Sequence, residues 1–284
     1  MSDRPDVLYA PSTTTFDVVA KPLNLREKLT DQAAFRKTGL LLLLAILWEA
    51  YARWLNNPLL FPKFSETVAA LFSGIASGEL PRAAAYTIQM LLKGYAAGLA
   101  LAALLTAFAS ATRIGADLLE TLTAMFNPLP SIALLPLALV WFGLGNGSII
   151  FVLIHAVLWA VALNAHAGFR AVSPTWRMVG QNYGLSRPAY IARILIPGAF
   201  PSILAGLKVG WAFAWRTMIA AELVFGVSSG SGGLGWYIFE RKNELLIPSV
   251  FAGLLTVILF GLLVENLVFR TLENRTVRRW GMQT

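Results

Sequence analysis

Six stretches of this 284-residue chain are apolar over a length that can cross a lipid bilayer, and this feature restricts the fold most strongly. A membrane-spanning helix needs about 20 predominantly apolar residues. The chain is 57% hydrophobic and only 13% charged, whereas soluble domains average about 45–50% apolar and about 25% charged residues. Backbone inside lipid must satisfy its own hydrogen bonds, so each span is expected to be helical. The prediction is an all-α polytopic membrane protein with about six transmembrane helices, at 39–55, 86–109, 118–143, 148–168, 203–226 and 247–269.

The lysines and arginines outside these spans are distributed unequally between the two sides of the membrane. The N-terminal segment, every second loop and the C-terminal tail together hold 15 of them, and the other loops hold 4. Positive charge is enriched on the cytoplasmic side, so both termini are expected in the cytoplasm. The predicted parts are a cytoplasmic N-terminal segment at 1–38, a transmembrane domain at 39–270 and a cytoplasmic tail at 271–284. The polar start is too long for the n-region of a signal peptide, so the first span is expected to be retained.

The chain lacks the sequence signatures of an enzyme. It has no cysteine and no Gly-Lys pair, which excludes thiolate metal sites and a P-loop. It also lacks a Ser-His-Asp or His-Glu-x-x-His arrangement, so no catalytic residue, metal or cofactor is expected. His155 and His166 are eleven residues apart, too far for an i, i+4 metal pair, and are interpreted as satisfied packing residues.

A glycine-rich segment at 230–235 reads Gly-Ser-Gly-Gly-Leu-Gly and matches the dinucleotide-binding pattern G-x-G-x-x-G literally. That pattern requires a preceding strand within a βαβ unit. Here a membrane helix precedes it, so nucleotide binding is rejected. Gly232, Gly233 and Gly235 are interpreted instead as a flexible outer gate or a receptor contact.

A polar segment at 173–201 interrupts the apolar blocks and predicts two short helices joined by a tight turn. Ser173 is a suitable N-cap and the next residue is a proline, which the first helical position tolerates. Gly184 can adopt the left-handed conformation that ends a helix, and Ser186 can cap the next one. Pro197 is expected to help bend the chain into the following span. A helix–turn–helix of this size on a membrane surface suggests a docking element for another protein.

This segment resembles the cytoplasmic "EAA" loop of ABC-importer permeases, which ends in glycine, nine residues and then I-x-L-P. Gly184, Ile194, Ile196 and Pro197 match that spacing. The resemblance implies that a separate ATPase subunit seats on the loop. The residues that would carry this coupling are Asn182, Tyr183, Gly184, Leu185, Ser186, Arg187 and Pro197. The family's Glu-Ala-Ala is replaced at 178–180 by Met-Val-Gly, so its glutamate is absent.

The run from Pro130 to Gly145, with Trp-Phe-Gly-Leu-Gly at its end, resembles the nitrate, sulfonate and taurine branch of these permeases. The branch implies an ATP-driven importer of a small oxyanion, of the type I architecture, in a bacterial inner membrane. It also implies a second permease copy, two ATPase subunits and an extracytoplasmic binding protein as partners. A self-contained secondary anion transporter is the alternative, but it would need no docking loop.

The third span contains Pro128, Pro130 and Pro136, which remove backbone donors and must kink or unwind it. Irregular backbone at membrane depth is tolerated only inside protein or beside a wet cavity. A simple kink and a break that lines the transport pathway both remain open. The second interpretation places Pro130 on the pathway.

Arg216 lies near the middle of the fifth span, where an arginine costs at least about 2.5–3.5 kcal/mol on insertion scales. One interpretation pairs it with carbonyls of a neighbouring helix or with a carboxylate such as Glu49 or Glu265. The other makes it a source of positive potential for an anion that crosses the membrane, with Trp211 and Trp215 as an apolar wall. Both interpretations predict that its side chain faces protein or water rather than lipid.

Small and acidic residues in the spans are expected to serve helix packing. Gly94 and Gly98 form a G-x-x-x-G pair, which permits two backbones to approach closely. Glu222 lies near the outer end of its span and would repel an anion, so a helix-packing contact is expected for it.

Overall fold

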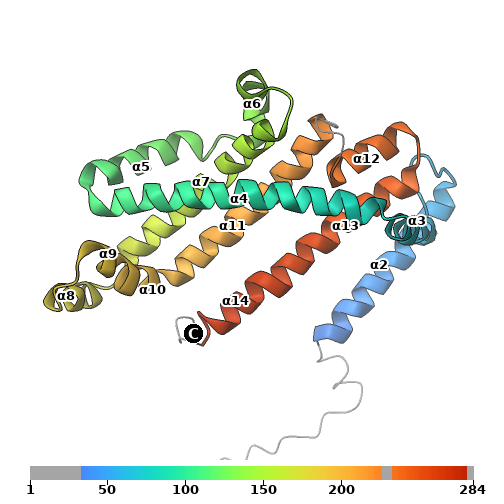
Figure 1. Ribbon diagram of the computed structural model, residues 1–284. Helices are drawn as coiled ribbons and strands as arrows, with labels where there is room; N and C mark the ends of the chain where they lie inside the picture. The colour runs from blue at the N-terminus through green and yellow to red at the C-terminus, as the bar shows by residue number, and fades with distance from the viewer. Residues whose placement is uncertain (1–32, 226–231, 280–284) are drawn as a thin grey trace, which may run out of the picture. The chain divides into compact units, whose positions relative to one another are not determined.

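The protein is all-helical over the part of the chain that the computed structural model describes, residues 33–225 and 232–279 (Figure 1). Within these described residues, 33–50 belong to one compact unit and those from 51 onward to another. The elements in chain order are α2 (Ala33–Leu55), α3 (Phe64–Ala76), α4 (Glu79–Ala111), α5 (Arg113–Phe126), the 3-10 turn η1 (Ser131–Leu134), α6 (Leu135–Phe142), α7 (Asn146–Ala171), α8 (Pro174–Asn182), α9 (Arg187–Tyr190), the π-helical turn η2 (Ile191–Leu195), α10 (Ile196–Gly198), α11 (Phe200–Phe225), α12 (Leu234–Asn243), α13 (Ile247–Leu263), the π-helical turn η3 (Val264–Phe269) and α14 (Arg270–Arg275).

The six-span prediction is confirmed, because four helices are long and apolar enough to cross a membrane and two bent pairs supply up to two more. The third span is not one helix: α5 and the η1–α6 segment meet at 88°. The α9–α10 segment likewise enters α11 through a bend of 76°. The helix that contains the last span continues from Ile247 to Arg275.

Helix α7 is the centre of the bundle, with α11 beside it and α4 crossing both (Figure 1). Small residues allow these helices to approach closely. A Cβ atom on Gly94 would lie 2.5 Å from the Cβ of Leu153, and one on Gly98 would lie 2.7 Å from the Cβ of Val157. Both partners belong to α7, so the G-x-x-x-G pair is confirmed as an internal packing motif.

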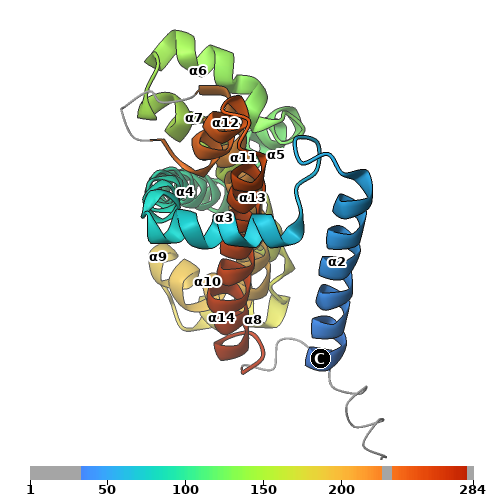
Figure 2. The ribbon, with the colours of Figure 1, turned by 90° about the vertical axis from the view of Figure 1, so that its right-hand side faces the viewer.

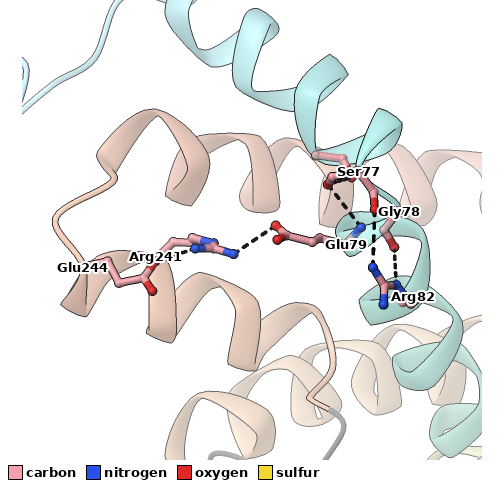
Figure 3. Close-up of polar contacts among 7 residues, drawn as sticks. Ser77, Gly78, Glu79, Arg82, Arg241 and Glu244 are labelled. Atoms are coloured by element: carbon pink, nitrogen blue, oxygen red, sulfur yellow. Dashed lines mark hydrogen bonds and ion pairs between the residues drawn. The ribbon is translucent and has the colours of Figure 1, made fainter.

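Two shorter helices, α3 and α12, pack against the long helices of the bundle. Helix α3 crosses α13 (Figure 2), and α12 packs on both α13 and α4. An ion pair joins these elements: Arg241 of α12 donates to Glu79 at the start of α4, at 2.9 Å. Figure 3 shows Arg241 between Glu79 and Glu244, with Arg82 folded back onto the Gly78 carbonyl at 3.0 Å.

We expect Gly98→Ala to lower the thermal unfolding temperature of the detergent-solubilised protein by several degrees. The added Cβ overlaps Val157, and overpacking of a buried site costs about 1–3 kcal/mol. Gly261→Ala is the matched control, because its Cβ would meet only Trp215, at an ordinary 3.8 Å. Equal unfolding temperatures for the two variants would contradict this account of the α4–α7 packing.

Candidate transport site and coupling loop

The α5–α6 span is broken at residues 127–130, where two prolines remove backbone donors. Helix α5 ends with the Asn127 N–H bonded to the Thr123 carbonyl at 3.0 Å. After the bend, the Ala133 N–H donates to the Pro130 carbonyl at 2.9 Å and starts the η1 turn. Several backbone groups at the break therefore lie outside the regular pattern of helical hydrogen bonds. They are located beside a cavity.

A cavity of about 310 Å³ lies at this break, between the α5–α6 connection, α7 and α11. Its wall includes Pro130, Ser131 and His155 together with Arg216 of α11. The Arg216 side chain is exposed within this chain, and the described residues provide it with no ion pair or hydrogen bond. Pro130 and Arg216, both predicted to line the pathway, thus lie on one cavity, which is called the Arg216 cavity below.

Glu265, the proposed partner of Arg216, lies 3.8 Å from Lys208 instead. Lys208 also donates to Glu273 at 2.7 Å, so the carboxylates of the last span neutralise a different cation on α11. Arg216 and Lys208 are eight residues apart, and only the lysine faces η3 and α14.

Trp211 and Trp215, predicted as an apolar wall beside Arg216, are not among the residues that line the Arg216 cavity. Both line a separate apolar cavity of about 470 Å³ against α4 and α13. The reason is helical geometry: at 100° per residue, Trp215 is turned about a quarter of a circle away from Arg216. Trp211 packs edge-on against Tyr95, with ring centroids 5.3 Å apart.

The two histidines also differ from the prediction, because neither is fully satisfied by its neighbours. His155 Nδ1 lies 3.1 Å from Ser131 Oγ, at the start of η1, but its Nε2 is buried without a partner. His166 Nδ1 is likewise buried without a partner. Each ring lines a cavity, so the eleven-residue spacing places them on one face of α7 that borders open space.

The polar segment 173–201 folds as predicted into two short helical legs. Pro174 is the first residue of α8, after Ser173 in the N-cap conformation, although the Ser173 side chain makes no cap bond. Gly184 ends this leg with φ +61°, the left-handed conformation expected of it. The Leu185 N–H donates to the Gly180 carbonyl at 3.2 Å and the Gly184 N–H to the Gln181 carbonyl at 2.9 Å, which completes a Schellman motif.

The turn of this segment projects outward. The Tyr183 side chain is 80% exposed, and Trp176 and Met178 on α8 are also exposed. Asn182 and Ser186 are exposed and Leu185 is half-buried, whereas the side chain of Arg187 lies outside the described part of the structure. Pro197 lies in α10, just before the 76° bend into α11.

An unpredicted residue, Arg177, ties α8 to the end of α7. Its guanidinium donates to the Phe169 carbonyl at 2.7 Å and to the Val172 carbonyl at 3.1 Å. These carbonyls belong to the last turn of α7 and the residue after it, where helical partners are missing. The sequence could have predicted this contact, because a cation is favoured near the C-terminus of a helix.

The glycines predicted as a flexible gate are packed around a buried carboxylate. Glu222 is only 3% exposed and accepts hydrogen bonds from the Thr87 hydroxyl at 2.8 Å and from the Gly235 N–H at 2.8 Å. A Cβ on Gly233 would lie 1.7 Å from a Glu222 oxygen, so glycine is required there by close approach. Gly232 is half-buried beside Trp236, and residues 230 and 231 lie outside the described residues.

The Glu222 contact joins three helices, as a packing role requires. Thr87 comes from α4, Glu222 from α11 and Gly235 from the first turn of α12. The Thr87 oxygen also accepts from the Leu234 N–H at 2.8 Å. The expectation of a helix-packing contact for Glu222 is confirmed.

We expect Thr87→Val to destabilise the protein strongly although it preserves the shape of the side chain. The variant leaves the buried Glu222 carboxylate without its hydroxyl donor and the Leu234 N–H without its acceptor, at a cost of about 1–3 kcal/mol. Thermal unfolding in detergent measures the effect. Thr121→Val is the control, because that hydroxyl bonds only the exposed Asp117 carbonyl; a drop no larger than the control's would refute the network.

Comparison with known proteins identifies the family. Residues 94–277 match the family model described as "Binding-protein-dependent transport system inner membrane component". The taurine transport system permease protein TauC of Escherichia coli is 33% identical over 158 residues, 56% of each chain. The nitrate import permease protein NrtB of a Synechocystis species is 30% identical over 152 residues, 54% of each chain. The bicarbonate transport system permease protein CmpB of Synechococcus elongatus is 27% identical over 154 residues, 52% of this chain and 54% of the relative.

The aligned regions cover about half of each of these three relatives, whereas the "Putative ABC transporter permease protein" of Methanocaldococcus jannaschii, 28% identical, is aligned over 84% of this chain and 90% of its own length. The family model covers α5 to α13 completely, including the broken span, the Arg216 cavity and the α8–α10 loop. Its members are membrane-embedded transport components rather than enzymes. The chain belongs to the ABC-importer permease family, the inner-membrane components of binding-protein-dependent transport systems.

Proposed function

We propose that this protein is the permease subunit of an ATP-driven importer that moves a small oxyanion of the sulfonate, taurine, nitrate or bicarbonate class. The observation that carries the proposal is Arg216, a guanidinium on a membrane span with no counter-ion among the described residues, beside a cavity at a broken helix. A cation in such a place is stabilised by water or by an anion that passes. Relatives named for taurine, nitrate and bicarbonate transport support the same class of cargo.

The α8–α10 loop is proposed as the seat of the ATPase subunit. It offers an outward turn, fixed by Gly184 and by the Arg177 bonds to the end of α7. A displacement of the loop would be transmitted to α7, which lines the Arg216 cavity, and through the 76° bend to α11. Alternating access then requires that nucleotide binds one state of the assembly more tightly than the other.

The complete assembly is proposed to contain two copies of this chain, two ATPase subunits and an extracytoplasmic binding protein. The transmembrane permease domain would occupy 39–270, with 1–38 and 271–284 in the cytoplasm of a bacterial cell. The excess of lysine and arginine on the side of the α8–α10 loop supports this orientation.

We expect Arg216→Gln to reduce anion uptake by the reconstituted assembly at least about tenfold, the effect of losing one charge-assisted interaction. Binding of the ATPase subunit should not change, because Arg216 lies on α11 away from the α8–α10 loop. Arg113→Gln, at the start of α5 and outside the cavity, is the control. Unchanged uptake kinetics in Arg216→Gln would remove this residue from the pathway.

Tyr183→Glu is expected to abolish co-purification of a P-loop ATPase with the permease. The side chain is 80% exposed at the turn, so a charge there should disturb docking without disturbing the fold. Leu245→Glu is a matched exposed control in the turn after α12, at the other end of the bundle. Normal ATPase recovery with Tyr183→Glu would argue against this turn as the docking surface.

A further inference from the structure

A second cavity, of about 570 Å³, lies between α5 and α7 and is called the α5–α7 cavity below. It shares Asn127 and Pro128 with the Arg216 cavity, so both cavities border the helix break. A third, smaller cavity shares His166 and Arg170 with it and reaches Arg177 and Tyr190 of the α8–α9 leg. The three cavities thus share lining residues in succession, from Arg216 toward the proposed ATPase side.

The polar residues of the α5–α7 cavity come from one face of each helix. Glu120 and Thr123 of α5 and its C-cap Asn127 recur at i, i+3 and i+7, and His166 and Arg170 are one turn apart on α7. The rest of the wall is apolar, as is typical of small-molecule sites, and the volume lies within their usual range of about 300–1,000 Å³.

The cavity carries two opposite charges that do not pair with each other. Glu120 and Arg170 are both exposed within the chain, and the described residues give neither side chain an ion pair or a hydrogen bond. His166 lines the same cavity, one helical turn before Arg170. Because this carboxylate and this guanidinium line the same cavity and do not pair with each other, both are available to bind a ligand.

Two further polar groups on this wall lack partners. The Thr123 side chain is 6% exposed, and its hydroxyl is buried without a hydrogen bond. His166 Nδ1 is in the same state. Buried polar groups are usually hydrogen-bonded, but these two lack a partner among the described residues, and a rotation of either side chain toward the cavity would let a bound group supply one.

We propose that the α5–α7 cavity is a second station on the pathway, built for a zwitterion that carries an ammonium group and an oxyanion, such as an aminoalkane sulfonate. Arg170 and His166 face the oxyanion and Glu120 faces the ammonium group. A simple anion such as nitrate or bicarbonate has no positive group to pair with Glu120, and the Glu120 carboxylate would repel it. The inference rests on the proposed function and narrows its cargo to zwitterions.

The test uses the permease purified with its ATPase subunit and measures equilibrium binding of taurine, with ethanesulfonate as the analogue that lacks the amine. Glu120→Gln should weaken taurine binding by about tenfold or more and leave ethanesulfonate binding unchanged, because only the ammonium contact is lost. Arg170→Gln should weaken both ligands by a similar factor. Asp117→Asn and Arg113→Gln, on α5 but outside the cavity, are the controls and should change neither.

Equal binding of taurine and ethanesulfonate by the unmodified protein would overturn the zwitterion station, as would a Glu120→Gln variant that binds both as the parent does. Recovery of the ATPase subunit with each variant verifies that the permease is folded. If the assembly transports nitrate or bicarbonate through Arg216 but binds no aminosulfonate, the station fails while the proposed function stands. If Arg216→Gln leaves all anion uptake intact, the proposed function itself fails.

Discussion

A guanidinium on a membrane-spanning helix must be stabilised by something other than lipid, and Arg216 imposes this constraint on the rest of the structure. The carboxylates at the end of the chain do not stabilise Arg216, because Glu265 and Glu273 pair with Lys208. The structure opens a cavity there instead, where the α5–α6 span loses its helical backbone. Non-helical backbone and an unpaired cation both need polar surroundings at membrane depth. One cavity can meet both needs, which is consistent with the helix break and Arg216 lying together.

Helix α7 connects this cavity to the surface where a partner would act. It packs on α4 through Gly94 and Gly98, where no side chain larger than hydrogen fits without a shift. Its last carbonyls are held by Arg177 of α8. The loop and the cavity wall are therefore joined through α7, while α12 is joined to α11 and α4 through the Glu222–Thr87 contact.

The fold was predictable from local chemistry, because length and apolar composition define spans, and prolines define where a span must break. The left-handed Gly184 was also predictable, since a helix end at that position requires φ above zero. Long-range contacts were not: Glu222 and Thr87 are 135 residues apart, and no pattern in either segment names its partner. The glycines at 232–235 suggested flexibility, but the structure uses Gly233 and Gly235 for close approach to a carboxylate.

The candidate site was predictable in part. The rarity of arginine within a span singled out Arg216, but its two tryptophan neighbours were assigned by proximity in sequence, and the helical turn carries them to a different cavity. The face formed by Glu120, Thr123 and Asn127 repeats with helical spacing, and that periodicity could have revealed it. These residues line a cavity only because α7 packs opposite them, and the sequence alone does not reveal that packing.

The central claim is that an anion passes the Arg216 cavity through water rather than lipid, and the absence of cysteine from the chain allows a direct measurement. A cysteine is placed at Ala220, on the cavity wall, and another at Ala214, which is fully buried on the same helix. The account predicts that a charged, membrane-impermeant thiol reagent labels Ala220→Cys, that the transported anion slows this labelling, and that Ala214→Cys stays unlabelled. Labelling of Ala220→Cys by lipid-soluble reagents alone, with no protection by any anion, would contradict it.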